Sequence, residues 1–400
     1  MLRFLTAGES HGPQLTVILD GVPAGLALST EAIDAHMHRR QYGHGRSERQ
    51  KMESDHAEIV GGVRGGVTLG SPVALVIANK VWEHWGDRMR IEEGDTGPTV
   101  TALRPGHADL AGAMKYGQDD VRNILERSSA RETASRVAAG TIARTLLAEL
   151  DITIHSHTIQ VSSIHAAPLP PAYGTGVATH DRAALSAFWG HVEASPVRCA
   201  DDGAGQAMVD AIDEAKRDGV TLGGVSEIVV YGLPVGLGSH TQWDRKLDGR
   251  LAAALMSIQS VKGVEIGPAF ENAGLRGDVV HDIVAYEGGW KRATNRAGGL
   301  EGGITNGEPL LARIAVKPIS TMRHALPSTD LLTGEQTPAH YERSDTAVVP
   351  AAGVIGEAMV ALVLADALLE KCGGDSMTEI KRNLHAFVAD QQARMDAVGR

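Results

Sequence analysis

The chain has 400 residues, of which 43% are hydrophobic and only 4% aromatic, and its formal net charge at pH 7 is −11. This charge argues against non-specific binding to nucleic acid or to an anionic membrane, and the few aromatic residues argue against a protein that stacks single-stranded bases. The two cysteines, Cys199 and Cys372, provide no disulfide framework, so a reducing, cytoplasmic location is expected.

Secondary structure is predicted along the whole chain. Short apolar runs rich in β-branched residues predict five strands: Gln14–Leu19, Pro72–Ala78, Ile152–Ile164, Ser226–Tyr231 and Leu310–Val316. Apolar residues at helical spacing predict six helices: Thr30–Arg40, Ser129–Leu150, Ala207–Asp218, Asp244–Ser257, Val349–Lys371 and Met377–Ala397. Ser129 and Glu132 have the spacing of a capping box. The most apolar long segment carries Glu357 and Asp366, which favours a buried helix over a membrane span.

Three short patterns occur twice in the same order. Gly21–Leu26 resembles Gly232–Leu237, and both follow an apolar strand, whereas Gly65–Pro72 and Gly302–Pro309 both precede one; Ala138–Gly140 is repeated as Ala351–Gly353. The alternative is that glycine-proline turns next to strands simply look alike. The repeats predict two related halves, about 1–150 and 220–370, in an α+β protein built as a β-α-β sandwich within one compact domain.

The segment Gly8–Gly12 contains an adjacent Ser10 and His11 between glycines. It satisfies the G-x-S-x-G pattern of a serine hydrolase, but that pattern requires a helix after the serine, and here Pro13 and a predicted strand follow. The other interpretations are a histidine that approaches a flat ligand and a histidine that only stabilises a turn.

Basic residues gather in several segments of this acidic chain. Five cationic side chains oppose one Glu in His36–Lys51, Arg104 precedes His107 and Asp109, and two arginines accompany the serines of Arg127–Thr133 at the predicted start of a long helix. Arginine forks and free N–H groups at a helix start both bind phosphate or carboxylate. A solvated basic loop and simple helix capping are the plainer alternatives.

Two further segments, Lys317–Thr321 and Arg343–Asp345, combine basic and hydroxyl side chains at predicted element ends, where they could hold the phosphate or ribityl chain of a cofactor. No Walker A loop, no G-x-G-x-x-G after a strand and no metal-binding motif is present in the sequence.

Taken together, these segments resemble the signatures of the chorismate synthase family, in the family's order. The matching segments are Gly8–Gly12, Arg104–Asp109, Arg127–Gly140, Ser257–Gly267, Lys317–Thr321 and Arg343–Glu357. The resemblance covers about residues 1–370 and is closest to the monofunctional bacterial type, which takes reduced flavin from a flavin reductase or another source. It implies a β-α-β sandwich, a homotetramer, no nucleic-acid or membrane partner, and a requirement for reduced FMN (FMNH2), with NADPH involved only in reducing the flavin.

The implied reaction is an anti 1,4-elimination that converts 5-enolpyruvylshikimate 3-phosphate to chorismate and phosphate. The implied catalytic residues are His11, His107 and Asp345, where His107 with Arg104 assists loss of phosphate, His11 maintains the ionisation state of the flavin and Asp345 helps the flavin accept the C6 proton. By position, the flavin would contact Arg127, Ser128, Ser129, Gln259, Ser260, Gly302, Lys317, Pro318, Ile319, Ser320, Thr321 and Arg343. Some relatives have Asn-Ala in place of Gln259-Ser260, which leaves the role of these side chains open.

The phosphate of the substrate or of NADP would be bound by arginines, for which the candidates are Arg40, Arg46, Arg49, Arg104 and Arg131. A doubly anionic sugar-acid carrying a phosphate accounts for an arginine-rich site in an acidic protein. A non-enzymatic anion-binding protein would use the same arginines, but it would not require His11, His107 and Asp345 to converge.

Overall fold

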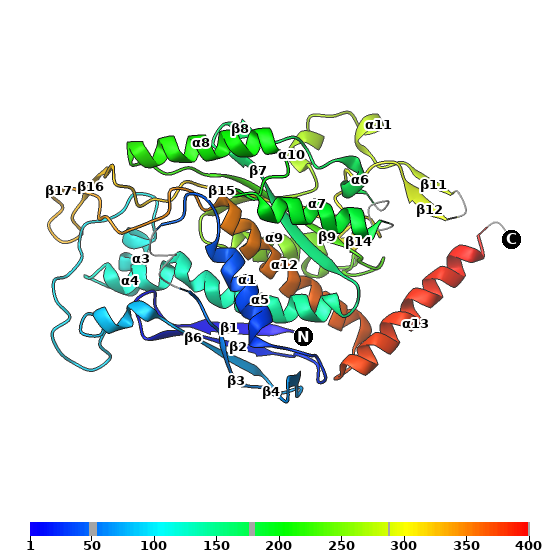
Figure 1. The fold of residues 1–400 in the computed structure, drawn as a ribbon, viewed down its shortest axis with the longest axis horizontal. Helices are drawn as coiled ribbons and strands as arrows, with labels where there is room; N and C mark the ends of the chain where they lie inside the picture. The colour runs from blue at the N-terminus through cyan, green and yellow to red at the C-terminus, as the bar shows by residue number, and fades with distance from the viewer. Residues whose placement is uncertain (48–53, 176–180, 287–288, 399–400) are drawn as a thin grey trace.

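The computed structural model describes residues 1–47, 54–175, 181–286 and 289–398. Two antiparallel sheets enclose a layer of helices, and two more helices cover the outer face of the second sheet (Figure 1). The first sheet has the order β1 (Arg3–Ala7), β2 (Gln14–Asp20), β6 (Val73–Ala78), β3 (Glu58–Gly61). The second has the order β10 (Val261–Ile266), β15 (Leu310–Val316), β9 (Gly224–Tyr231), β7 (Thr153–Val161), β8 (Ile164–His165). This is the α+β sandwich that the sequence predicts.

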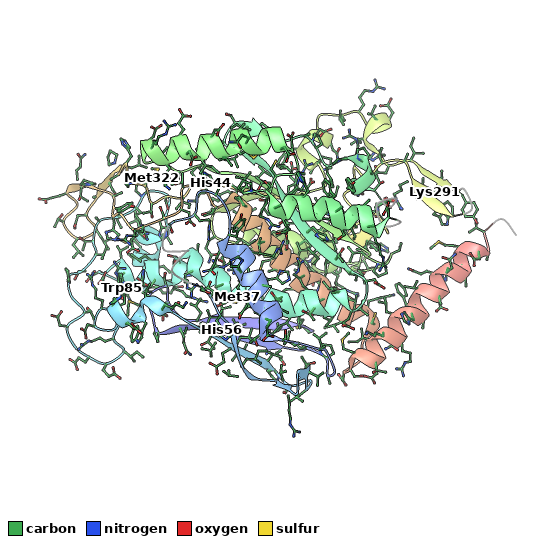
Figure 2. The ribbon with its side chains drawn as sticks, in the orientation of Figure 1. Met37, His44, His56, Trp85, Lys291 and Met322 are labelled. Atoms are coloured by element: carbon green, nitrogen blue, oxygen red, sulfur yellow. The ribbon has the colours of Figure 1, made fainter. Side chains whose placement is uncertain are left out.

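Four helices form the central layer: α1 (Thr30–Gln41), α5 (Thr133–Ala148), α9 (Leu247–Met256) and α12 (Val349–Cys372). Met37 of α1 is completely buried in this layer (Figure 2). Helix α12 is long and apolar enough to cross a membrane, but 89% of its most apolar window is buried inside the protein. It is therefore the core helix of the sandwich.

The remaining elements surround this core. Helices α7 (Arg182–Ala194) and α8 (Asp202–Asp218) lie on the far side of the second sheet, and α13 (Met377–Asp396) extends from the end of α12 (Figure 1). Short helices are α3 (Asp109–Tyr116), α4 (Arg122–Ser128), α6 (Pro171–Gly174), α10 (Ala269–Asn272), α11 (Gly277–Val280), η1 (Lys80–His84), η2 (Ala130–Glu132) and η4 (Trp243–Arg245). Small hairpins are β4 (Val63–Arg64) with β5 (Val67–Thr68), β11 (Val284–Tyr286) with β12 (Trp290–Arg292), β13 (Leu300–Glu301) with β14 (Ile304–Thr305), and β16 (Pro327–Thr329) with β17 (Gln336–Pro338).

The two sheets repeat one topology. In chain order the first is built from β1, β2, α1, β3, β6 and α5, and the second from β7, β9, α9, β10, β15 and α12. The strand order β1-β2-β6-β3 corresponds to β7-β9-β15-β10, and every pairing is antiparallel. The fold is thus made of two pseudo-repeated halves. The second begins at β7 (Thr153) and not near residue 220 as the sequence repeats predicted, because β7 is the equivalent of β1. The central helices α5 and α12 of the two halves pack directly against each other.

Local contacts follow the same repeat. The Thr68 hydroxyl donates to the Pro23 carbonyl at 2.6 Å and accepts the Leu26 N–H at 2.9 Å. In the second half, the Thr305 hydroxyl donates to the Pro234 carbonyl at 2.6 Å and accepts the Leu237 N–H at 2.8 Å. The segment Gly21–Leu26 of the first half and the segment Gly232–Leu237 of the second half are therefore held by the same two hydrogen bonds.

Several sequence predictions need correction. The strand predicted over 152–164 is two strands, β7 and β8, because Ser162 turns the chain with φ 52°. The helix predicted from Ser129 begins at Thr133, after the separate turn η2. No capping box forms there: Ser129 accepts the Arg131 N–H, and the Glu132 carboxylate pairs with Arg136 instead.

Candidate active site

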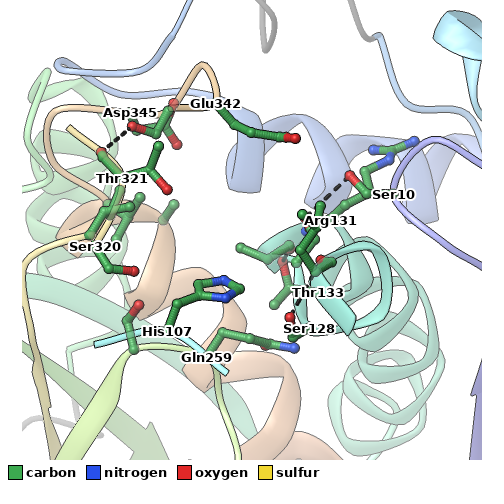
Figure 3. A pocket seen from close by; sticks show the side chains of 18 of the residues that line it. Ser10, His107, Ser128, Arg131, Thr133, Gln259, Ser320, Thr321, Glu342 and Asp345 are labelled. Carbon is green, nitrogen blue, oxygen red and sulfur yellow. Dashed lines mark hydrogen bonds between the residues drawn. The ribbon is translucent and has the colours of Figure 1, made fainter. Parts of the chain in front are cut away.

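A cavity of about 510 Å³ lies beside the central helices and is lined by residues of both halves. The first half contributes the loop after β1, the end of α1 and the segment from α4 to α5. The second half contributes the turn before β10, the segment after β15 and the first turns of α12. Figure 3 shows Ser128 and Arg131 facing Ser320, Thr321 and Asp345 across this space.

The three predicted catalytic residues, His11, His107 and Asp345, all line this cavity although they lie far apart in the sequence. The ring of His107 points into the cavity between its two walls (Figure 3). The convergence that distinguishes an enzyme from a simple anion-binding protein is therefore present.

His11 is 5% exposed and is held on two sides. Its Nδ1 lies 2.9 and 3.0 Å from the two carboxylate oxygens of Glu126, and its backbone N–H donates to Glu126 at 2.8 Å. Its ring stacks on Trp85 with a centroid distance of 4.0 Å. Burial would raise the pKa of Glu126, but hydrogen bonding to His11 and the charge of His11, together with Arg122, lower it below its usual value. Glu126 is therefore ionised at neutral pH.

His107 is held by a second carboxylate. Its Nδ1 lies 2.5 Å from Oδ1 of Asp109, a completely buried residue that also accepts two hydrogen bonds from the Arg104 guanidinium at 2.8 and 2.9 Å. Burial alone would raise the pKa of Asp109, but the His107 and Arg104 hydrogen bonds and their charges hold it well below its usual range. Because Asp109 neutralises Arg104, this arginine positions its neighbours rather than presenting a free charge.

Asp345 accepts a hydrogen bond from Arg46 Nη1 at 2.6 Å and another from the Ser47 N–H at 2.6 Å. These bonds connect the loop after α1 with the segment before α12, 299 residues apart. Asp345 is only 9% exposed. The arrangement closes one wall of the cavity and engages both oxygens of the carboxylate.

The predicted phosphate-binding arginines have different environments. Arg40 and Arg131 both line the cavity and share the buried carboxylate of Asp55, at 2.7 and 2.5 Å. Arg46 and Arg104 also line it, paired with Asp345 and Asp109. Arg49 lies outside the described residues. Four of the five candidates thus converge on one cavity.

Most of the predicted flavin contacts line the same cavity: Ser128, Ser129, Gln259, Ser260, Lys317, Ile319, Ser320, Thr321 and Arg343. Arg127, Gly302 and Pro318 do not. The Arg127 guanidinium donates to the carbonyls of Thr6 and Gly8 and lines a separate hollow of about 360 Å³ next to Gln259. Gly302 lies in the turn between β13 and β14.

The structure also differs from the prediction that Arg127 and Ser128 form an anion cradle at a helix start. Arg127 and Ser128 are the last two residues of α4, where backbone carbonyls rather than N–H groups are free, and the Ser128 hydroxyl donates to the Ile124 carbonyl. Arg343 lies in a loop six positions before the first residue of α12, so it does not begin a helix either. Neither arginine is therefore accompanied by free N–H groups of a helix start, and Arg343 contributes to the cavity through its side chain alone.

Two cationic side chains of the cavity, Lys317 and Arg343, have no ion-pair partner in the described part of the chain. Burial, with a smaller effect of Lys262, lowers the pKa of Lys317. Cationic groups that line a cavity without internal counter-charges favour an anionic ligand.

Sequence reasoning missed the residues behind the histidines. Glu126, Trp85 and Arg122 form the support of His11, and Arg122 also pairs with Glu342 at 2.9 Å. Burial would raise the pKa of Glu342, but His340 and Arg122 lower it to about 2. Glu126 immediately precedes Arg127-Ser128-Ser129, and this position was the only indication in the sequence that Glu126 belongs to the site.

The serine hydrolase interpretation fails on the structure. Ser10 is followed by β2 rather than by a helix, and the Ser129 hydroxyl donates to its hydroxyl at 3.2 Å. The adjacent imidazole is fixed by Glu126 through Nδ1. Ser10 lacks the strand–turn–helix setting that a nucleophile elbow requires.

Known proteins resemble this chain over nearly its whole length. The chorismate synthase family model matches residues 2–369. The chain belongs to the chorismate synthase family. Relatives named chorismate synthase include those of Trichlorobacter lovleyi, 52% identical over 97% of this chain and 99% of the relative, and of Desulforudis audaxviator, 53% identical over 97% of both chains. A crystal structure of a chorismate synthase is 42% identical, with a TM-score of 0.78 over 98% of both chains.

Membership of this family makes the protein a lyase of the last common step of the shikimate pathway. The cavity described above, with two histidines from the first half and cationic side chains from both halves, is the candidate active site.

Proposed function

We propose that the protein converts 5-enolpyruvylshikimate 3-phosphate to chorismate and inorganic phosphate, and that it requires reduced FMN. The observation that carries this proposal is the convergence of His11, His107 and six cationic side chains on one cavity of an acidic protein. The cationic residues are Arg40, Arg46, Arg104, Arg131, Lys317 and Arg343. A substrate with two carboxylates and a phosphate matches this excess of arginine.

The residues of the cavity are compatible with a bound flavin. Its volume of about 510 Å³ lies within the range of about 300–1,000 Å³ that is usual for ligand sites. Two buried polar atoms at the cavity, Gln259 Oε1 and Arg40 Nε, have no hydrogen-bond partner among the described residues, as expected where a ligand completes the site. Gln259, Ser260, Lys317 and Ile319–Thr321, with Ser128, Ser129 and Arg343, would hold the flavin. When bound, reduced FMN supplies the electron-rich group that no side chain offers.

The proposed reaction removes one proton from C6 and the phosphate from C3, on opposite faces of the ring, and forms a second ring double bond. Arg40, Arg46 and Arg131 bind the carboxylates and the phosphate, and they neutralise the charge that develops on the leaving group. Arg104 holds Asp109 and His107 in place. His107 donates a proton to the departing phosphate through Nε2. His11 holds a proton next to the flavin site. The group that takes the C6 proton would be supplied by the bound flavin, and Asp345, held by Arg46 and the Ser47 N–H, would assist this transfer.

The assembly and the source of the cofactor are part of the same proposal. Leu5 and Ile18, paired across β1 and β2, are 66% and 44% exposed on the uncovered face of the first sheet. An exposed apolar sheet face favours association with further copies, and we infer a cytoplasmic homotetramer. Reduced FMN would come from a flavin reductase or another donor, with NADPH needed only for that reduction.

The experiment is an anaerobic assay in which chorismate and phosphate are both quantified. Enzyme, substrate and reduced FMN should give equal amounts of the two products, whereas oxidised FMN alone should give neither. Turnover without any flavin would contradict the cofactor proposal. Binding of the substrate with no product under reducing conditions would favour the alternative of a non-enzymatic anion-binding protein.

A further inference from the structure

The two histidines of the cavity are held in the same way. Each has its Nδ1 at a buried carboxylate, and each carboxylate is also bonded to an arginine: Glu126 to Arg122 at 2.9 Å, and Asp109 to Arg104 at 2.8 and 2.9 Å. Glu126 is 2% exposed and Asp109 is 0% exposed. The two units come from different segments, so the arrangement arises twice at one cavity.

An ionised carboxylate can only accept hydrogen bonds, so the imidazole nitrogen beside it must carry a proton. Arg104 Nη2 also lies 3.0 Å from Nδ1 of His107, but both nitrogens are donors that share Oδ1 of Asp109, so this proximity does not make Nδ1 an acceptor. The arginine keeps each carboxylate ionised. The tautomer of each ring is therefore fixed with hydrogen on Nδ1.

We propose that Glu126 and Asp109 are positioning residues of the reaction, which hold His11 and His107 with Nδ1 protonated so that both histidines act on the ligands through Nε2. This inference rests on the proposed function, because it assigns the two carboxylates to the same chemistry. Neither carboxylate lines the cavity, so each acts through its histidine.

The chain contains a matched arrangement outside the site. His157 Nε2 lies 3.0 Å from Glu227 Oε1, and Glu227 accepts a hydrogen bond from Arg313 at 2.7 Å. His157 and Glu227 are 2% and 1% exposed and belong to the second sheet. This histidine contacts its carboxylate through Nε2 instead of Nδ1 and does not line the cavity. Glu227 is thus a control for the purely structural effect of removing a buried carboxylate charge.

The test compares Glu126→Gln and Asp109→Asn with Glu227→Gln in the full-length enzyme, using reduced FMN and substrate. The amide keeps the shape but can present an N–H to Nδ1, which selects the opposite tautomer. Each of the first two variants should lower kcat by roughly 10–10³-fold, up to the range of a positioned acid or base, with KM changed less than about threefold. Glu227→Gln should lower the thermal midpoint and leave kcat within about twofold.

A double-mutant cycle separates positioning from general damage. If Glu126 acts through His11, adding Glu126→Gln to His11→Ala should cause no further loss of kcat, and Asp109→Asn should behave likewise in His107→Ala. If an amide variant does not fold, Glu126→Asp and Asp109→Glu, which keep the charge but change the reach, should lower kcat at least about fivefold at unchanged KM.

Normal kcat in the folded single variants would overturn the positioning role. So would a kcat in the double variants that is lower than in the corresponding histidine variant alone. A loss confined to KM would overturn it as well. These outcomes are distinct from failure of the proposed function, in which the unmodified enzyme itself forms no chorismate.

Discussion

Glu357 is 1% exposed in the middle of α12, and opposite charges at short range compensate for its burial. Its carboxylate lies 2.7 Å from Arg39 and 2.6 Å from Arg144, and it accepts a hydrogen bond from Ser156 at 2.6 Å. Burial would raise the pKa of Glu357, but the charges of Arg39 and Arg144 hold it far below its usual value. This cluster connects α1, α5 and β7 to α12 and places Arg40, the neighbour of Arg39, at the cavity.

Two half-buried histidines lie near this cluster, and both are uncharged at neutral pH. Burial, together with the nearby Arg144, lowers the pKa of His36 to about 3 and that of His155 to about 4. An unfolded histidine titrates near 6.5. As the pH falls below about 6.5 the unfolded chain therefore takes up protons that the folded protein does not, and stability decreases until the folded pKa is reached.

We predict that His155→Phe makes the protein less sensitive to mild acid. Phenylalanine can retain the stacking on Trp189, now at a centroid distance of 4.7 Å, but it does not titrate. Between pH 7.5 and 5, the variant should lose roughly 2 kcal/mol less stability than the unmodified protein. Thermal midpoints measured at both pH values test this, with the exposed His385→Asn as control. Equal losses in all three proteins would contradict it.

At the scale of elements, the contact between α5 and α12 requires a glycine. A Cβ atom at Gly140 would lie 2.4 Å from the Ala358 Cβ and 2.6 Å from the Ala358 Cα. Because one of these atoms belongs to the backbone of α12, a side chain at Gly140 can be accommodated only if the helices move apart.

Gly140→Ala should therefore destabilise the protein by about 1–3 kcal/mol or more, despite the better helix propensity of alanine. Gly190 in the exposed face of α7 is the matched control, since a Cβ there meets nothing within 4 Å. Gly190→Ala should be neutral or stabilising by up to about 1 kcal/mol. Chemical denaturation of the two variants decides the matter, and a Gly140→Ala protein as stable as the Gly190→Ala protein would contradict it.

The central elements were predictable because their apolar patterns are long. The sequence predicted β15 with its observed ends and α12 to within one residue. The edge strand β10 was missed because Lys262, Gly263 and Glu265 interrupt its apolar pattern. Helix α7 was missed although Leu185, Phe188, Trp189 and Val192 have helical spacing after the capping residue Asp181.

The site was predicted as a set of segments rather than as a geometry. His11 and His107 could be selected from their motifs, but the pairing of Arg46 with Asp345 joins residues 299 positions apart and is a consequence of tertiary structure. The displacement of Arg127 from the main cavity has the same origin: its side chain is held by the carbonyls of Thr6 and Gly8.

At the scale of the whole molecule, the two halves share a topology but have different loops. A short loop carrying His11 joins β1 to β2, whereas the corresponding connection from β7 to β9 contains β8 and the helices α6, α7 and α8. Helix α7 covers the second sheet through Trp189, which packs on Val229 and Tyr231. The first sheet has no such cover among the described residues, and its exposed face is the one proposed to meet other copies.

The duplication predicts equal energetic roles for equivalent residues. Thr68 and Thr305 are 2% and 1% exposed and make the same two hydrogen bonds, to Pro23 and Leu26 in one half and to Pro234 and Leu237 in the other. Valine has the same shape but leaves the buried leucine N–H and proline carbonyl without that hydroxyl. Each unsatisfied group costs about 1–3 kcal/mol.

Thr68→Val and Thr305→Val should therefore destabilise the protein by similar amounts, each about 2–6 kcal/mol for the two unsatisfied groups, and the double variant should show the sum, since distant sites without shared partners are additive. Thr→Ser at each position is the control, because serine retains the hydroxyl and should recover most of the loss. Denaturation midpoints of the variants provide the measurement. If one substitution lowered the stability strongly and the other did not, the shared contacts would be only a local similarity between two turns. The two halves would then contribute unequally to the stability of the sandwich.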